Sequence, residues 1–283
     1  MHKYHPQTKE ELIEAIKKEI YEIQGNIDNP NWEADLNCID TSNITDMSEL
    51  FAIEIFENFN GDISKWNVNN VINMSYLFYE NQFNQDISKW NVSNVKNMER
   101  MFAESPFNQD ISGWNVSNAK YMSGMFGGSK FNQDISSWDV GNVRDMSGMF
   151  VYTPFNQDIS SWNVNNVKKM DWMFAYSEFN QDISGWDVRN VKDMSGMFAY
   201  SKFNQDISSW NVSNAKYMSG MFEGSPFNQN ISNWDLSNKY KKDMLKNTPL
   251  EKKLQEQDQQ KVNNEDVNEN IDNDDEFEVE MSF

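Results

Sequence analysis

A ten-residue phrase recurs along this chain at a fixed interval of 24 residues. The phrase Phe-Asn-Gln-Asp-Ile-Ser-Ser-Trp-Asn-Val begins at Phe155, and close copies begin at Phe83, Phe107, Phe131, Phe179, Phe203 and Phe227. The complete unit reads F-N-Q-D-I-S-x-W-(N/D)-V-x-N-(V/A)-K-x-M-x-x-M-F, followed by four variable residues. A fixed period of about 20 to 50 residues is typical of solenoids, in which each repeat buries its apolar side chains only against its neighbours.

The apolar residues within one unit are separated by 4, 3, 2, 3, 3, 3 and 1 positions, which fits neither a helix nor a strand throughout. We therefore expect a short extended piece, Gln-Asp-Ile-Ser-x-Trp, followed by a helical turn, Met-x-x-Met-Phe. The extended pieces of successive units would stack in parallel about 4.8 Å apart. The predicted fold class is an α/β repeat solenoid whose 24-residue coils each hold one short parallel strand and one helical turn.

The first segment, residues 1–31, is predicted to form a helix that caps the array. Thr8 occupies an N-cap position, and Glu11 three residues later completes a capping box. Apolar residues then recur at every fourth position, at Leu12, Ile16 and Ile20. Gly25 provides a stop. A helix with one apolar face has to dock, and the first coil of the array is the expected partner.

Degraded copies of the unit at both ends set the bounds of the solenoid at residues 32–250. One copy spans residues 32–40, and three extra residues interrupt the period between Phe51 and Phe59. The other copy, residues 243–250, comes one residue early and places Lys241 where the other copies have a core Met. Atypical terminal repeats of this kind shield the ends of an array.

The last segment, residues 251–283, holds 12 acidic and three basic residues. Thr248 and Glu251 could cap a short helix where it begins. Beyond about residue 260 the composition predicts an acidic, disordered tail.

The formal net charge of −20 argues against several classes of function. A strongly acidic surface repels phosphate backbones and anionic membranes, so we expect no nucleic-acid partner. No apolar stretch reaches the 18 residues of a membrane span, so we expect no membrane insertion. Cys38 is the only cysteine and cannot form an internal disulfide.

The residues needed for catalysis are scarce. His2 and His5 are the only histidines, in a terminus expected to fray, which rules out a Ser-His-Asp or Cys-His arrangement inside the array. Carboxylates are plentiful, but each has copies in other units, whereas an active site is unique. We expect no enzyme, no cofactor and no metal site.

One carboxylate recurs in almost every unit, at Asp62, Asp86, Asp110, Asp134, Asp158, Asp182 and Asp206. Stacked carboxylates repel unless hydrogen bonds are donated to them. Backbone amides of the adjacent turn are the expected donors, and bridging Ca²⁺ is the alternative. The recurring Asn and Ser, such as Asn84 and Ser88, are predicted to form ladders that satisfy backbone groups at the turns.

Two sets of aligned residues are candidates for partner binding. A basic stripe recurs six positions after Trp, at Lys96, Lys120, Arg144, Lys168, Lys192 and Lys216. It could dock an acidic partner, or it could be a solvated edge that offsets the Asp ladder. An aromatic row in three successive units consists of Tyr152, Tyr176 and Tyr200. Stacked rings suit a sugar or a peptide, but they could equally cover the turn after the Met-Phe core.

The unit N-V-S-N-V-K-N-M-E-R-M-F followed by F-N-Q-D-I-S-G-W resembles the repeat of BspA-like leucine-rich-repeat (LRR) surface proteins. It is most similar to their mycoplasma-type branch of unknown function, with W-(D/N)-V-S-N-V-x-x-M-x-x-M-F. T-K-E-E-L-I-E-A-I-K-K-E-I and I-D-T-S-N-I-T-D-M-S-E-L-F also match, so the resemblance covers residues 8–250. It implies an LRR-like solenoid and, for many members, an adhesive role at the cell surface or as a secreted protein.

From the residues and the resemblance together we expect a monomeric, non-catalytic recognition or adhesion module. It would bind a protein, or alternatively a glycan, along the side that presents the variable residues of the units. Residues 103–105, 127–129 and 151–153, for example, differ at matched positions. The alternatives are a structural spacer without a specific ligand and a Ca²⁺-stabilised array. As written, without signal peptide or membrane span, the chain is expected in the cytoplasm.

Overall fold

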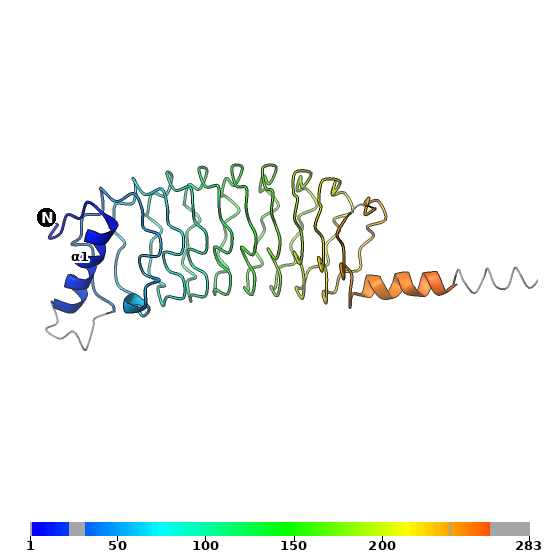
Figure 1. Cartoon of the computed structure of the whole chain (residues 1–283), viewed down its shortest axis with the longest axis horizontal. Helices are drawn as coiled ribbons and strands as arrows, with labels where there is room; N and C mark the ends of the chain where they lie inside the picture. Colours follow the sequence, from blue (N-terminus) through cyan, green and yellow to red (C-terminus); the bar gives the residue numbers. More distant parts are fainter. Residues whose placement is uncertain (1, 23–31, 238, 261–283) are drawn as a thin grey trace, which may run out of the picture.

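The computed structural model describes residues 2–22, 32–237 and 239–260, which form an elongated solenoid of stacked coils (Figure 1). Helix α1 (Lys9–Glu22) covers the N-terminal end of the stack. A single 3-10 turn, η1 (Glu54–Phe56), bulges from an early coil, where the sequence has its three extra residues. Helical residues 249–260 project from the opposite end.

Successive coils are joined by parallel pairing of one residue per coil. Within the described residues, eight such bridges run in series from the Asp46–Asn73 pair to the Tyr217–Tyr240 pair. The paired residue is the x of the K-x-M segment. The predicted strand at Gln-Asp-Ile-Ser-x-Trp is therefore wrong, except in the first coil, where Asp35 pairs with Asp62. The reason is that this segment folds into turns closed by its own Asp side chain, which leaves no straight run for pairing.

The Met-x-x-Met-Phe segment forms a chain of turns, and the predicted helical turn is wrong. We name the eight residues from the paired residue onward the turn ribbon, which is residues 97–104 in one coil. The amides of Arg100, Phe102 and Glu104 donate to carbonyls of the next coil, at 2.9, 2.9 and 2.7 Å. The amides between them donate to the carbonyl three residues back. A helix cannot form because every second amide is used between coils.

Two positions in the turn ribbon have left-handed backbone conformation. In one coil they are Arg100, with φ 48°, and Glu104, with φ 56°. In the next coil both equivalent residues are glycines, Gly124 and Gly128. A left-handed conformation costs about 1–2 kcal/mol for a residue with a Cβ atom, so side chains at these two positions are present at some cost in stability.

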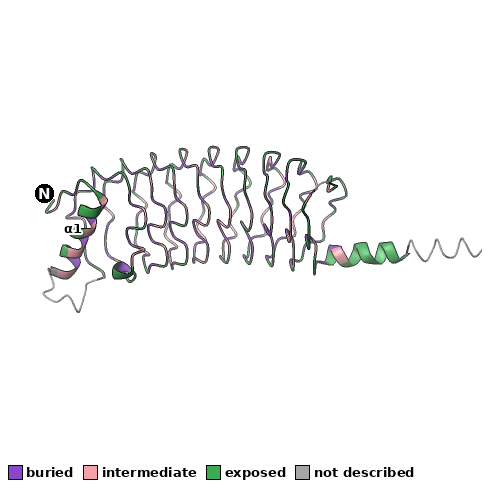
Figure 2. Cartoon of the chain, viewed as in Figure 1, coloured by how far each residue is buried: buried purple, intermediate pink, exposed green. Residues whose placement is uncertain are grey.

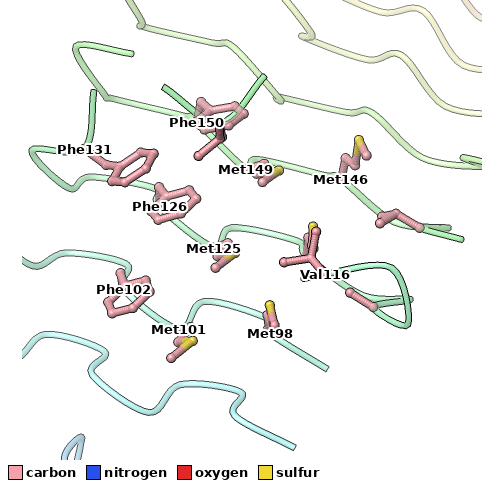
Figure 3. Close-up of a cluster of buried hydrophobic side chains, with 14 of the residues drawn as sticks. Met98, Met101, Phe102, Val116, Met125, Phe126, Phe131, Met146, Met149 and Phe150 are labelled. Atoms are coloured by element: carbon pink, nitrogen blue, oxygen red, sulfur yellow. The ribbon is translucent and has the colours of Figure 1, made fainter. Parts of the chain in front are cut away.

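The core consists of aromatic and Met side chains that stack along the axis (Figure 3). Between ring centroids, Phe102 lies 3.8 Å from Phe107 and 5.8 Å from Phe126, its equivalent 24 residues later. These rings are fully buried, and Figure 2 shows buried residues in every coil. The Trp of seven successive coils, from Trp66 to Trp210, also bond between coils, as when Nε1 of Trp114 donates to the carbonyl of Ile87 at 3.1 Å. By contrast, Nε1 of Trp234 in the last copy has no hydrogen-bond partner among the described residues.

The recurring polar residues make hydrogen bonds that repeat from coil to coil. Oδ1 of Asn84 accepts the backbone amide of Asn108 at 2.9 Å, so the predicted Asn ladder is confirmed. The Ser prediction is wrong, because the amide of Ser112 donates to Oδ1 of Asp110 in its own coil at 2.9 Å. That bond is the main reason why the pKa of Asp110 lies below its usual value. The prediction that backbone amides donate hydrogen bonds to the Asp row is therefore confirmed.

Helix α1 begins as its sequence predicts. Oγ1 of Thr8 accepts the amide of Glu11 at 3.2 Å, and the carboxylate of Glu11 accepts the amide of Gln7 at 2.7 Å. The apolar face is fully buried at Leu12, Ile16 and Ile20. Gly25 lies outside the described residues.

The residues before α1 are held against the first coil, which contradicts the predicted frayed terminus. Tyr4 pairs in parallel with Ile39, and Nδ1 of His5 lies 3.2 Å from Oδ2 of Asp40. Lys3 forms an ion pair with Glu19 of α1 at 2.8 Å. Backbone pairing at Tyr4, which no local sequence pattern indicates, fixes this segment.

The last coil keeps the ladder despite its missing residue. The amide of Met218 donates to Tyr240 at 2.8 Å and that of Phe222 donates to Met244 at 2.9 Å, so the deletion lies before Tyr240. Lys241 is exposed where other coils bury Met, and its Nζ donates to the carbonyl of Leu236.

The helix after the last coil has the predicted cap. The amide of Glu251 donates to Oγ1 of Thr248 at 3.1 Å. Residues 249–260 are helical, as the capping residues predict, while the predicted disordered tail beyond about residue 260 lies outside the described residues. In the part of the chain that the structure describes, no helix is long and apolar enough to cross a membrane.

Candidate ligand-binding face

The outward side chains of the turn ribbons form one surface, which we name the ribbon face. In one coil they are Asn97, Glu99, Arg100 and Glu104. The backbone of the ribbon satisfies its own hydrogen bonds, so these side chains are not needed for stacking. By contrast, Asn, Asp and Trp of the repeated phrase each make a bond that the stack needs. Because only the side chains of the phrase are needed for stacking, the residues of the ribbon face vary between coils and those of the phrase do not.

Exposed aromatic side chains are concentrated on the ribbon face. Among the described residues, seven aromatic side chains are between 39% and 62% exposed, and all seven occupy outward positions of turn ribbons. They are Tyr121, Tyr152, Trp172, Tyr176, Tyr200, Tyr217 and Tyr240. Clustered exposed aromatics are typical of binding surfaces, where Tyr and Trp are enriched.

The predicted row of Tyr152, Tyr176 and Tyr200 is a stacked ladder. The ring centroids are 4.4 and 4.8 Å apart, and all three residues have left-handed backbone, with φ between 54° and 57°. The ring of Tyr200 lies over Gly224, where a Cβ atom would be 2.5 Å from it. Its hydroxyl donates to Glu223 at 3.0 Å. Tyr200 therefore covers backbone of the next coil, and all three rings remain partly exposed.

The predicted basic stripe is brought into one line by backbone hydrogen bonds. Each amide donates to the carbonyl of the preceding member at 2.8 or 2.9 Å, through Lys96, Lys120, Arg144, Lys168, Lys192 and Lys216. Lys120 is half-buried and the other five side chains are exposed. The stripe directly precedes the ribbon in each coil, whereas the Tyr ladder occupies its last position. The two candidate sets therefore flank the ribbon face on opposite edges.

A depression of about 590 Å³ lies in the ribbon face between these edges, across five coils. Its floor includes three glycines, Gly124, Gly127 and Gly148. Residues with larger side chains line it on the preceding coils (Tyr79, Arg100 and Glu104), at the end of the ribbon that holds Gly148 (Tyr152), and on the following coil (Lys169 and Trp172). Sequence reasoning assigned the variable residues 127–129 to the binding side but did not predict a depression there. The available signal was glycine at the positions where other coils place Arg100 and Trp172.

The depression contains a short hydrogen-bonded chain of polar groups. Oγ of Ser147 lies 2.7 Å from Oδ1 of Asp145 and 2.6 Å from Oδ1 of Asp171. A hydroxyl carries one proton and can donate to only one of the two carboxylates. Burial raises the pKa of Asp171, which favours a proton on that carboxyl as the second donor. Nζ of Lys169 lies 3.4 Å from the other oxygen of Asp145.

The described residues contain no group of three or more His, Cys, Asp or Glu side chains arranged to hold a metal ion. In the Asp row, each pKa is lowered by bonds from the Ser two positions later, as at Asp134 and Ser136. The geometry therefore accounts for stacked carboxylates through protein donors alone.

The fold and the face together define a repeat solenoid with one variable surface. The model of a family described as Mycoplasma protein of unknown function, DUF285, matches residues 20–130, 101–178, 153–258 and 176–282. These overlapping matches span nearly the whole chain, and the protein belongs to this family. Comparisons with curated proteins and with solved structures gave no match.

Proposed function

We propose that this protein is a non-catalytic recognition module that binds a protein partner along the ribbon face. The observation that supports this most directly is the position of the seven exposed aromatic side chains, all of them on that face. The repeated phrase, by contrast, has residues committed to hydrogen bonds within and between coils and varies little, so it offers little for specificity.

The physical basis would be many small contacts on a rigid surface. Nine coils about 4.8 Å apart give a face about 40 Å long, which suits an interface of standard size. Backbone hydrogen bonds between coils fix the side-chain rows before a partner arrives, which lowers the entropy cost of binding. Residues that line the edges, the basic stripe and the Tyr ladder, would extend the contact.

The resemblance to BspA-like LRR surface proteins supports an adhesive role at the cell surface. We propose the LRR-like surface assignment on that resemblance alone. The second candidate is a spacer without a specific ligand, which the regular, fully hydrogen-bonded coils would also suit.

The test compares partner capture by the parent chain and three variants. The ladder variant carries Tyr152→Gly, Tyr176→Gly and Tyr200→Gly, which copies the glycines that other coils have at this position. The stripe variant carries Lys120→Ser, Arg144→Ser, Lys168→Ser and Lys192→Ser. The control variant carries Lys65→Ser and Lys89→Ser, two exposed positions on the repeated phrase where several other coils have Ser.

A partner from host-surface or cytosolic extract that is retained by the parent and the control, and lost from the ladder or stripe variant, is the expected result. Equal retention by all four proteins would place binding away from the ribbon face and contradict the proposal. Retention of nothing by the parent would favour the spacer.

A further inference from the structure

We propose that the depression in the ribbon face binds a neutral carbohydrate, one or two rings of an oligosaccharide. This inference rests on the proposed recognition function and specifies the chemistry of one part of the same face. It draws on three features of the depression: its shape, its aromatic walls and its balance of charges.

The shape of the depression follows from missing side chains. A Cβ atom on Gly124 would lie 2.9 Å from Cγ of Arg100, and one on Gly127 would lie 3.1 Å from Cγ1 of Val151. Glycine at these places lowers the floor by the height of a side chain relative to the coils on both sides. The resulting volume of about 590 Å³ is in the range of pockets for small ligands, about 300–1,000 Å³.

The wall on the following coils is aromatic. The indole of Trp172 lies over Gly196, with Cδ2 and Cε2 each 2.9 Å from the place of a Cβ atom. Trp172 also lines the depression and is exposed, as is Tyr152, at 46% and 60%. Aromatic rings that are held flat and open on one side suit the C–H face of a sugar ring. Both residues have left-handed backbone, a conformation that costs stability in each case and calls for a reason beyond folding.

The polar groups favour a ligand without net charge. Four carboxyl groups line the depression, on Glu99, Glu104, Asp145 and Asp171, and the charged ones on Glu99, Glu104 and Asp145 oppose an anion. Two cations, Arg100 and Lys169, also line it and oppose a cation, although Lys169 is partly neutralised by Asp145. Sugar hydroxyl groups both donate and accept hydrogen bonds, so they can pair with the carboxylates and with the guanidinium at once.

The experiment measures binding of defined sugars by the full-length protein and three variants. The probes are chitotriose, maltotriose and N-acetyllactosamine, each free in solution and attached to a glycan array, so that free sugars and the ends of glycoconjugates are distinguished. Sialyllactose and hexa-arginine serve as anionic and cationic probes. Saturation-transfer NMR reports contact with the free ligands. A change in tryptophan emission that is lost in Trp172→Gly reports its site, since the eight Trp of the repeated phrase are at most 7% exposed.

Each variant introduces a residue that already occurs at the equivalent position of another repeat, so that the fold is retained. Trp172→Gly and Tyr152→Gly place glycine at left-handed positions that are glycine in other coils, and Tyr200→Gly is the matched control outside the depression. We expect at least one neutral sugar to bind, with affinity at least about tenfold weaker in Trp172→Gly and Tyr152→Gly. The Tyr200→Gly protein is expected to bind like the parent.

Absence of binding by every neutral probe, or equal binding by Trp172→Gly and the parent, would overturn the inference. Binding of hexa-arginine or sialyllactose in preference to the neutral sugars would overturn it as well. In each of these cases the proposed function survives if the ladder or stripe variant still loses a captured protein, so the two failures are distinguishable.

Discussion

The side-chain oxygen of Asn132 accepts a hydrogen bond from the backbone amide of Asn156, 3.0 Å away in the next coil. The amide of Asn132 in turn donates to Oδ1 of Asn108 at 2.9 Å. Each Asn side chain thus accepts the hydrogen bond of a backbone amide in the following coil. The ladder transmits the register of one coil to the next.

Substitution of Asn132 by Ala should therefore destabilise the array. The amide of Asn156 loses its acceptor in a half-buried place, which costs about 1–3 kcal/mol. Asn228 ends the ladder, with no further Asn stacked on it in the described residues, so Asn228→Ala is the matched control and should cost less. Urea unfolding followed by circular dichroism measures both. A similar loss in the two variants would mean that the ladder bond contributes little.

Substitution of a glycine by Ala should cost more stability at a left-handed position than elsewhere. Gly148 has φ 60°, and a Cβ atom there meets nothing closer than 3.6 Å, so Gly148→Ala tests backbone strain without a clash. We expect a loss of about 1–2 kcal/mol. Gly113 is the control, since it has ordinary backbone and open space around a Cβ atom, and Gly113→Ala should be neutral or slightly stabilising. The opposite order of stability would contradict the left-handed assignment.

The stacking of the coils could be predicted from the sequence because its cause repeats. Phe107 and Trp114 recur in phase, and only contact with the next copy can bury residues so spaced. The Asn ladder followed for the same reason, since a polar residue repeated without change needs a repeated partner. The one-residue deletion in the last coil could also be predicted, because the copy that contains Met244 comes one residue short of the period. In the structure the amide of Phe222 donates to the carbonyl of Met244, so the ladder continues.

The turn ribbon could not be predicted from spacing alone. Met98, Met101 and Phe102 have the separations of one helical turn, and the same separations arise in linked turns whose alternate amides bond to the next coil. That choice is made by contacts between coils and leaves no local pattern. The depression was hidden for a related reason. Gly124 and Gly148 form a low floor only because neighbouring coils have larger residues, Arg100 and Trp172, at the same position.

Removal of calcium should leave the thermal stability unchanged. The carboxylate of Asp158 accepts the amide of Ser160 at 2.9 Å, and this bond lowers its pKa without a metal ion. We expect the same melting temperature in EDTA and in millimolar CaCl₂, measured by differential scanning calorimetry. Magnesium serves as the control for ionic effects. A melting temperature that falls in EDTA and recovers with calcium alone would favour the Ca²⁺-stabilised array.

The raised pKa of Asp171 predicts a specific dependence of stability on pH. Below its usual value of 3.8 the carboxyl is protonated in both folded and unfolded chains and has no effect on pH dependence. As the pH rises toward the higher folded pKa, the unfolded chain releases the proton first, and the free energy of unfolding falls. Asp171→Asn keeps a donor toward Ser147 and cannot ionise, so it should be more stable than the parent at pH 7, with the difference shrinking toward pH 3.

Asp110→Asn is the control of opposite sign. The pKa of Asp110 is lowered by the amide of Ser112, so its charge stabilises the folded chain above the usual value of 3.8, and this contribution is lost as the pH falls. Asp110→Asn should therefore melt below the parent at pH 7 and approach it at pH 3. Melting temperatures of the parent and both variants between pH 3 and 7 give the two curves. Curves for Asp171→Asn and Asp110→Asn that diverge from the parent in the same direction would show that Asp171 is ionised in the fold and that Ser147 donates to both carboxylates in turn.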